Sequence, residues 1–205
     1  MLPVTPPLDA LLADLAAWSP PDPEQARLRT AYRDRLLAAG PAALRRDGGP
    51  EHVTASALVL DPDLERTVLC LHRKGRFWVQ PGGHLEPDDA DVAAAALREA
   101  REETGLTGPM ALPGLLDLNR HALPAGFGAC RVHWDVGVAV TAPADAVPAV
   151  SDESHAVAWF ALDALPQPLA GSVATRLQRA RALLAGRSGA GRSAGSRATG
   201  DGGGT

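Results

Sequence analysis

Cysteine is scarce in this chain, which has two among its 205 residues. Cys70 and Cys130 each lie in an apolar, strand-like run, so we predict two buried thiols rather than a disulfide or a metal-binding pair. No stretch approaches the about 18 consecutive apolar residues of a membrane span. An excess of basic residues is also missing, since the formal net charge is -4 and the pI is about 5.8. This balance argues against nucleic acid or an anionic membrane as a partner.

The N-terminus has no cationic segment of the kind that begins a secretion signal, and the acidic residues Asp9 and Asp14 follow within the first fourteen positions. We therefore expect a cytoplasmic protein. The length and an apolar content of 45% allow one domain of ordinary size with extensions.

Two helices are predicted before the main domain, at 8–18 and 23–39, because apolar residues recur there at helical spacing. Asp22 is placed to cap the second helix, with Pro23 at its first position. We interpret residues 1–49 as an N-terminal helical extension. It could cover a sheet or build a homodimer contact, and the pattern does not decide between these roles.

The apolar period changes to that of strands from His52 onward. We expect strands at 53–60, 67–71, 77–80, 115–118, 130–140 and 156–160, and helices at 91–104 and within 162–184. Residues 186–205 are rich in Gly, Ser, Arg and Ala without periodicity, which predicts a disordered tail. The main domain is thus assigned to 50–185.

Three carboxylates in the helix predicted at 91–104 are spaced at i, i+3 and i+4: Glu99, Glu102 and Glu103. These positions share one side of a helix, where like charges repel by a few tenths of a kcal/mol per pair. Divalent cations compensate such an arrangement, and hard oxygen ligands suit Mg²⁺ or Mn²⁺.

The segment from Gly82-Gly83-His84-Leu85-Glu86 to Leu106 resembles the Nudix box, G-x5-E-x7-R-E-U-x-E-E-x-G-U, in which U is a bulky aliphatic residue. The second half matches at Arg98, Glu99, Glu102, Glu103, Gly105 and Leu106, with Ala100 at the first U. The first half departs, because Asp89 stands at the first glutamate and the spacer to Arg98 has eight residues rather than seven.

A solvated acidic helix face is the alternative interpretation of this segment, since Arg98 and Glu102 are placed to pair at i, i+4. Against it stand Gly105, which ends the helix, and the Pro81-Gly82-Gly83 turn that precedes it. The joint match of several residue types at fixed spacing favours the functional interpretation.

The resemblance implies an α/β (α+β) fold, a Nudix-type αβα sandwich with a mixed sheet, here with an N-terminal helical extension. It implies a Mg²⁺-dependent hydrolase, with Mn²⁺ as a substitute. Such an enzyme cleaves a phosphoanhydride bond in a nucleoside diphosphate linked to another moiety. ADP-ribose-like compounds, nucleotide sugars and nucleoside triphosphates all remain open as the small-molecule substrate.

Several residues take roles through this resemblance. Glu99, Glu102 and Glu103 would hold the metal, together with the main-chain carbonyl near Gly83. Arg98 would orient a glutamate by a charge-assisted hydrogen bond. The general base is left open among Glu102, Glu103 and Glu153, the last of which could equally be an exposed turn acid.

Substrate contacts are predicted around the glycine turn and the preceding loop, at His84, His72, Arg73, Arg76, Trp78 and Glu86. Cations near a metal site would neutralise a diphosphate, although charge runs are usually only solvated. The histidines could instead be ordinary polar groups, and Trp78 could belong to the core. Glu86 is slightly favoured over Asp89 as an acid in the outer metal shell.

Two other functions fit the same resemblance less well. A non-catalytic Nudix-fold ligand-binding module would often lose box glutamates, whereas all three helix glutamates are present here. The isopentenyl-diphosphate isomerases share a histidine near this turn. They need a cysteine beside it, however, at the position of Gly83, and Cys70 lies on a different predicted strand.

Overall fold

The computed structural model describes residues 7–124, 128–151 and 154–194, with side chains described up to Leu184. Its strands are β1 Glu51–Leu60, β2 Arg66–His72, β3 Trp78–Val79, β4 Gly82–His84, β5 Met110–Ala111, β6 Asp117–Ala122, β7 Val132–Thr141 and β8 Ser154–Ala161. Its helices are α1 Pro7–Ala17, α2 Pro23–Ala39, the 3₁₀ helix η1 Gly40–Leu44, α3 Val92–Thr104 and α4 Gly171–Ala194.

All eight strands join one sheet, in which β3, β2, β1, β7 and β5 follow one another. The short β4 pairs with β1, β6 pairs with β7, and β8 pairs with β2. The central strands β1 and β7 run parallel along their whole length, while the other pairs are antiparallel. The sheet is therefore mixed, as the family resemblance implied.

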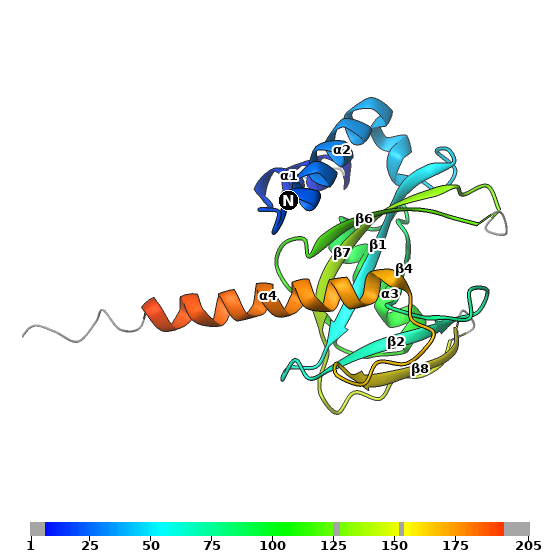
Figure 1. Ribbon diagram of the computed structural model, residues 1–205. Coiled ribbons are helices and arrows are strands. Elements are labelled where there is room, and N and C mark those ends of the chain that lie inside the picture. The colour runs from blue at the N-terminus through cyan, green and yellow to red at the C-terminus, as the bar shows by residue number, and fades with distance from the viewer. Residues whose placement is uncertain (1–6, 125–127, 152–153, 195–205) are drawn as a thin grey trace, which may run out of the picture.

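Helices cover both faces of this sheet. Successive side chains of a strand point to opposite faces, and in β1 both sets include apolar residues that pack against a helix. On one face Val53, Ala55 and Val59 of β1 pack with the small residues Ala96 and Ala100 of α3. On the other face Leu58 and Leu60 pack with Val173, Leu177 and Ala180 of α4. The αβα arrangement predicted from the resemblance is confirmed, and Figure 1 shows α4 crossing in front of the strands.

The N-terminal helices pack onto the main domain, above the sheet in the view of Figure 1. Leu11, Leu15, Tyr32 and Leu36 are buried in the core that contains α3. Gln25 of α2 bonds both backbone polar groups of Leu118 in β6, accepting from its N–H at 2.8 Å and donating to its C=O at 3.0 Å. The extension thus covers the sheet.

A buried ionic network joins α4 to the sheet. Arg176 is fully buried, and it donates to Asp117 at 2.8 Å and to Asp135 at 2.6 Å. Asp135 also accepts hydrogen bonds from Thr54 and Ser56 of β1, at 2.9 Å each. Pairing and hydrogen bonding of this kind are what allow charges to remain away from water.

The observed elements differ from the predicted ones mainly at their ends. The strand expected at 115–118 begins at Asp117 and continues through the polar run to Ala122, because pairing with β7 overrides local composition. The last helix begins at Gly171, after the prolines, and its backbone extends to Ala194 rather than ending at 184. The part of the predicted disordered tail at 195–205 lies outside the described residues.

Within the described ranges, no helix has both the length and the apolar character that crossing a membrane requires.

A chain ended after Ala185 is expected to keep its melting temperature to within about 2 °C. Among the side chains that the structure describes, the apolar residues that α4 packs against the sheet, such as Val173, Leu177 and Ala180, precede that point. Calorimetry on the shortened and full chains measures the effect, and a chain ended after Thr175, which lacks Arg176, serves as the destabilised control. A clearly lower melting temperature for the first variant would show that residues after 185 stabilise the fold.

Candidate metal and diphosphate site

Local capping signals place the acidic helix α3 on the sheet. The Asp91 carboxylate accepts from the Ala94 N–H at 2.8 Å and caps the first turn. Gly105 ends the helix with a left-handed backbone, φ 65°, which glycine adopts without strain. Both boundaries agree with the helix predicted at 91–104.

Arg98 is the centre of the polar contacts on α3. Its guanidinium donates to Glu99 and to Glu102 at 2.9 Å each, and to the main-chain oxygen of His84 at 2.8 Å. It also donates two bonds to Asp89, at 3.0 and 3.2 Å. One planar cation thus ties two box glutamates to the turn before the helix.

These neighbours also explain the charge state of Arg98. Burial opposes its charged form, but the carboxylates of Asp89 and Glu99 overcome this and raise the pKa of Arg98. The guanidinium therefore stays protonated and holds the two carboxylates in place.

Of the two acids near the first box glutamate, Asp89 makes the closer contact with Arg98. Its side chain is 7% exposed and bonds Arg98, whereas Glu86 is 60% exposed and lies 3.8 Å from the same guanidinium. Asp89 also accepts from the Glu86 N–H at 2.8 Å, which closes the turn. The extra spacer residue is thus accommodated without loss of the contact to Arg98. The favoured role of Glu86 in an outer metal shell stays a prediction.

Glu99 faces the glycine turn. A Cβ added at Gly83 would collide with the Glu99 carboxylate, so only glycine allows this approach. Glu99 is buried, Glu102 is exposed, and Glu103 lies between these extremes. The three carboxylates therefore differ in their exposure to solvent, although all three belong to α3 at the spacing that places them on one side of a helix.

The end of α3 at Glu103 contacts β2, the strand that leads into the basic loop. The Cys70 thiol of β2 lies 3.9 Å from the main-chain oxygen of Glu103, and burial, together with the Glu103 charge, raises the pKa of Cys70. The loop begins two residues further on. Its His72 ring accepts from the Gly75 N–H at 2.9 Å and stacks on Phe77.

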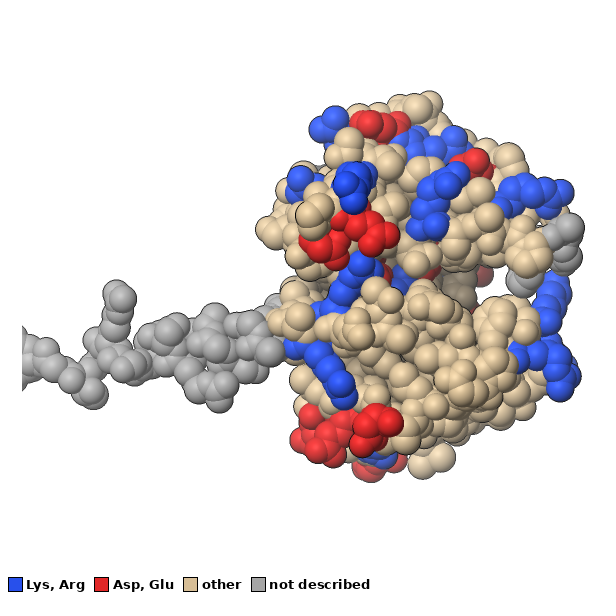
Figure 2. Space-filling model, viewed as in Figure 1, with Lys and Arg blue, Asp and Glu red and all other residues tan. Residues whose placement is uncertain are grey.

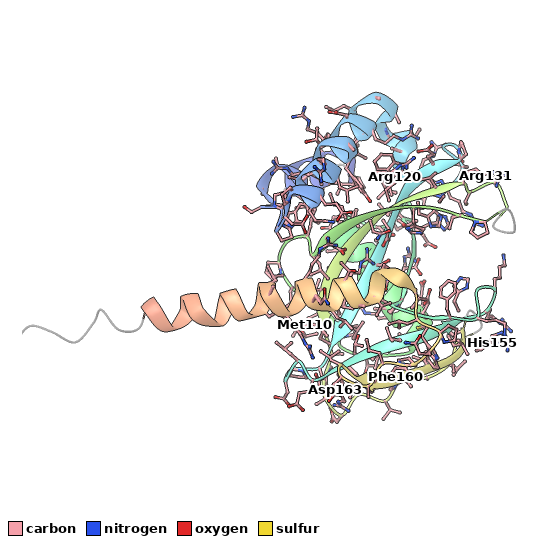
Figure 3. The ribbon with its side chains drawn as sticks, in the orientation of Figure 1. Met110, Arg120, Arg131, His155, Phe160 and Asp163 are labelled. Atoms are coloured by element: carbon pink, nitrogen blue, oxygen red, sulfur yellow. The ribbon has the colours of Figure 1, made fainter. Side chains whose placement is uncertain are left out.

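Arg73, Lys74 and Arg76 of this loop are exposed. In Figure 2 cationic side chains gather at the right-hand edge of the molecule, above and below a hollow in the surface. The lower group lies over the β2–β3 loop of Figure 1, and Arg131, labelled in Figure 3, lies on the upper side.

The other predicted substrate residues are spread more widely. Trp78 packs edge-on against Phe160, with ring centres 4.7 Å apart, in the core beneath α4. His84 points its ring at His52, with the two Nε2 atoms 3.0 Å apart. Glu153 lies outside the described residues. Substrate contact by His72, His84, Arg73, Arg76, Trp78 and Glu86 stays a prediction.

Sequence reasoning missed two features near this turn. One is a cavity of about 730 Å³ that is lined by η1, by Leu85–Pro87 after the glycine turn, and by Cys130. The other is a group of imidazoles around His84. Burial and neighbouring rings lower the pKa values of His84 and His133 to about 4, so both rings are neutral at pH 7. The group of imidazoles depends on strand register and the cavity on how η1 meets distant loops, and neither leaves a local signal in the sequence.

Comparison with known proteins places this geometry in context. The family model described as the NUDIX domain matches residues 50–180, a range that contains each of the strands β1 to β8 and the whole of α3. The match covers well over half of the chain and stops short of the N-terminal helices.

Solved structures with the same fold include an Ap4A hydrolase of C. elegans in a binary complex, with a TM-score of 0.54 at 19% identity over 65% of this chain and 98% of that one. The NUDIX domain of Shewanella oneidensis NrtR, complexed with ADP ribose, gives 0.52 at 22% identity over 74% and 97%. A UDP-X diphosphatase gives 0.50 at 16% identity over 84% and 90%. At these identities the likeness concerns the fold.

Proposed function

The chain belongs to the Nudix family and is a pyrophosphohydrolase of the Nudix type, and on that premise we propose that it uses Mg²⁺ to cleave a nucleoside diphosphate linked to another moiety. The observation that supports this most is the contact of Arg98 with Asp89, Glu99 and Glu102 beside the glycine turn. A carboxylate row held in this way provides oxygen ligands at fixed positions.

The residues present fit a hard divalent cation. Glu99, Glu102 and Glu103 would hold it, with a main-chain oxygen from the turn at Gly83, where the missing side chain leaves the Glu99 carboxylate room. Bound Mg²⁺ would polarise a phosphoryl oxygen and lower the pKa of a coordinated water. Arg98 would keep Glu99 and Glu102 oriented, and a carboxylate among Glu102, Glu103 and Glu153 would accept the proton of the attacking water.

The basic loop supports a diphosphate substrate. Arg73, Lys74 and Arg76 follow directly on the strand whose Cys70 contacts the end of α3, and all three are exposed. Cations at the rim of a carboxylate site would offset the charge of the phosphates during binding and transfer. This argument concerns the diphosphate, and it leaves the moieties on either side of it open.

A panel of nucleotide substrates tests the proposal. We choose ADP-ribose, UDP-glucose, diadenosine tetraphosphate and ATP, each with Mg²⁺, with Mn²⁺ and with a chelator, and follow the products by chromatography. Cleavage of a compound such as ADP-ribose into AMP and ribose 5-phosphate, only with the metal, is the expected result. Tight binding of these compounds without any cleavage would instead indicate a ligand-binding module and would overturn the proposal.

A further inference from the structure

We propose that His52, His84, Cys130 and His133 form a second metal site, which binds Zn²⁺ and is separate from the carboxylates of α3. One donor atom from each of the four lies within 4.8 Å of the donors of the other three. His52 and Cys130 are buried, and His84 and His133 are partly buried.

Strand register brings these residues together. β1 and β7 run parallel with His52 beside His133, so the two rings leave the sheet on one face. Thr54, two residues further along β1, shares that face, and His84 of β4 is its antiparallel partner. Cys130 comes two residues before β7 begins, next to Arg131, which Figure 3 labels.

The opposite face belongs to the carboxylates. Gly83 precedes His84 in β4, so a side chain at position 83 would point to the other face of the sheet. A Cβ built there would meet the carboxylate of Glu99. The two sites therefore lie back to back on either side of the short strand β4. The Arg98 bond to the main-chain oxygen of His84, at 2.8 Å, connects them.

The distances fit tetrahedral zinc coordination. With Zn–N bonds of about 2.0–2.1 Å and a Zn–S bond of about 2.3 Å, two nitrogens are separated by about 3.3 Å and a nitrogen and a sulfur by about 3.6 Å. The Nε2 atoms of His52 and His84 are 3.0 Å apart, and the Cys130 Sγ lies 3.8 Å from the His84 Nε2. Small side-chain rotations would bring the remaining pairs to coordination distance.

The hydrogen bonds around the rings leave lone pairs for a metal. The His52 Nδ1 lies 3.1 Å from the main-chain oxygen of Gly49. A carbonyl can only accept, so the proton is on Nδ1 and the lone pair of His52 is on Nε2, which faces the cluster. The His133 Nε2 is buried without a hydrogen-bond partner. A histidine anchored through its other nitrogen, and a buried nitrogen without a partner, are both typical of ligands to a metal.

The donor set selects the metal and its role. Imidazole nitrogens and a thiolate favour Zn²⁺ over Mg²⁺, which prefers oxygen ligands. Four protein donors complete a tetrahedral shell, which is the pattern of structural rather than catalytic zinc. Bound zinc would therefore cross-link the starts of β1 and β7 to the glycine turn that supports the carboxylate site.

Metal binding by the full chain tests this inference. We expect one equivalent of Zn²⁺ to remain on the protein after gel filtration in the presence of millimolar Mg²⁺, which occupies carboxylates but competes poorly for imidazole and thiolate. Replacing Zn²⁺ with Co²⁺ should give the intense visible bands of a tetrahedral site and a thiolate-to-metal charge-transfer band. Either readout is independent of hydrolysis, so it can succeed or fail whatever the substrate panel shows.

Matched variants assign the ligands. Cys130→Ser and His133→Gln should weaken Zn²⁺ binding by at least about a hundred-fold, more than the loss of an outer contact causes. Cys70→Ser and Glu102→Gln should keep the full equivalent, since neither side chain belongs to the cluster. A wild-type protein that retains no Zn²⁺, or a Co²⁺ complex without the thiolate band, would overturn the proposal. The wild-type spectrum decides even if a variant fails to fold.

Discussion

Replacing Glu103 with glutamine is expected to lower Mg²⁺-dependent turnover by roughly 10²–10³-fold while the protein remains folded. A charge that helps hold the cation contributes several kcal/mol to transition-state stabilisation, and each 1.36 kcal/mol is worth about a factor of ten in rate. Glutamine keeps the size of the side chain, and removing one of three neighbouring like charges relieves repulsion on α3. Steady-state kinetics on the best substrate of the panel, together with a melting curve, measures both effects.

Glu24→Gln provides the matched control for this prediction. It makes the same chemical change at an exposed position in the first turn of α2, outside the carboxylate row. Its turnover should equal that of the wild type. If Glu103→Gln also kept near wild-type hydrolysis with Mg²⁺, the assignment of the α3 carboxylates as metal ligands would be wrong.

Arg176→Met is expected to cost about 3–5 kcal/mol of folding free energy, because it leaves Asp135 buried without its cation and leaves Asp117 with Arg179 as its remaining partner. For a domain of this size, such a loss lowers the melting temperature by roughly 10 °C. Methionine is similar in length and apolar, so the loss measures the missing charge more than a missing volume. Denaturant unfolding or calorimetry gives the value.

Two further variants make this prediction specific. Arg33→Gln removes an exposed arginine that pairs with Asp34 at 3.5 Å, and it should change stability by less than about 1 kcal/mol. The double variant Asp135→Asn with Arg176→Met should lose less folding free energy than the sum of the two single variants. Once Asp135 is a neutral asparagine, removing Arg176 no longer leaves a buried charge at that position. Strictly additive losses would mean that the two side chains do not act as a pair.

Local signals were sufficient for the helices near the site. Asp91 and Gly105 fix the ends of α3, and Asp22 and Pro23 fix the start of α2, because caps act within a few residues of the chain. The long strands β1, β2 and β7 were predictable for a similar reason, since each is an apolar run. The strands β4 and β5 were not predicted, because two or three residues provide no period.

Contacts between distant segments were beyond such reasoning. Asp89 was doubtful in the sequence because of the longer spacer, and its bonds to Arg98 follow from how the turn folds back on α3. The four residues of the proposed zinc site come from three separate segments and meet only through the registers of β1 with β4 and β7. In the sequence, Arg176 is one of several arginines in an Ala-rich helix, and nothing there marks it as buried.

The side chain of Gln25 has a consequence for solubility. An exposed strand edge invites another chain to add a strand, because its free N–H and C=O groups seek partners. Gln25 satisfies both groups of Leu118, so they are not free to pair with another strand. The helix α2 thus takes the place of a neighbouring strand at Leu118 on the outer side of β6. Without residues 1–49, β6 would become a template for edge-to-edge aggregation.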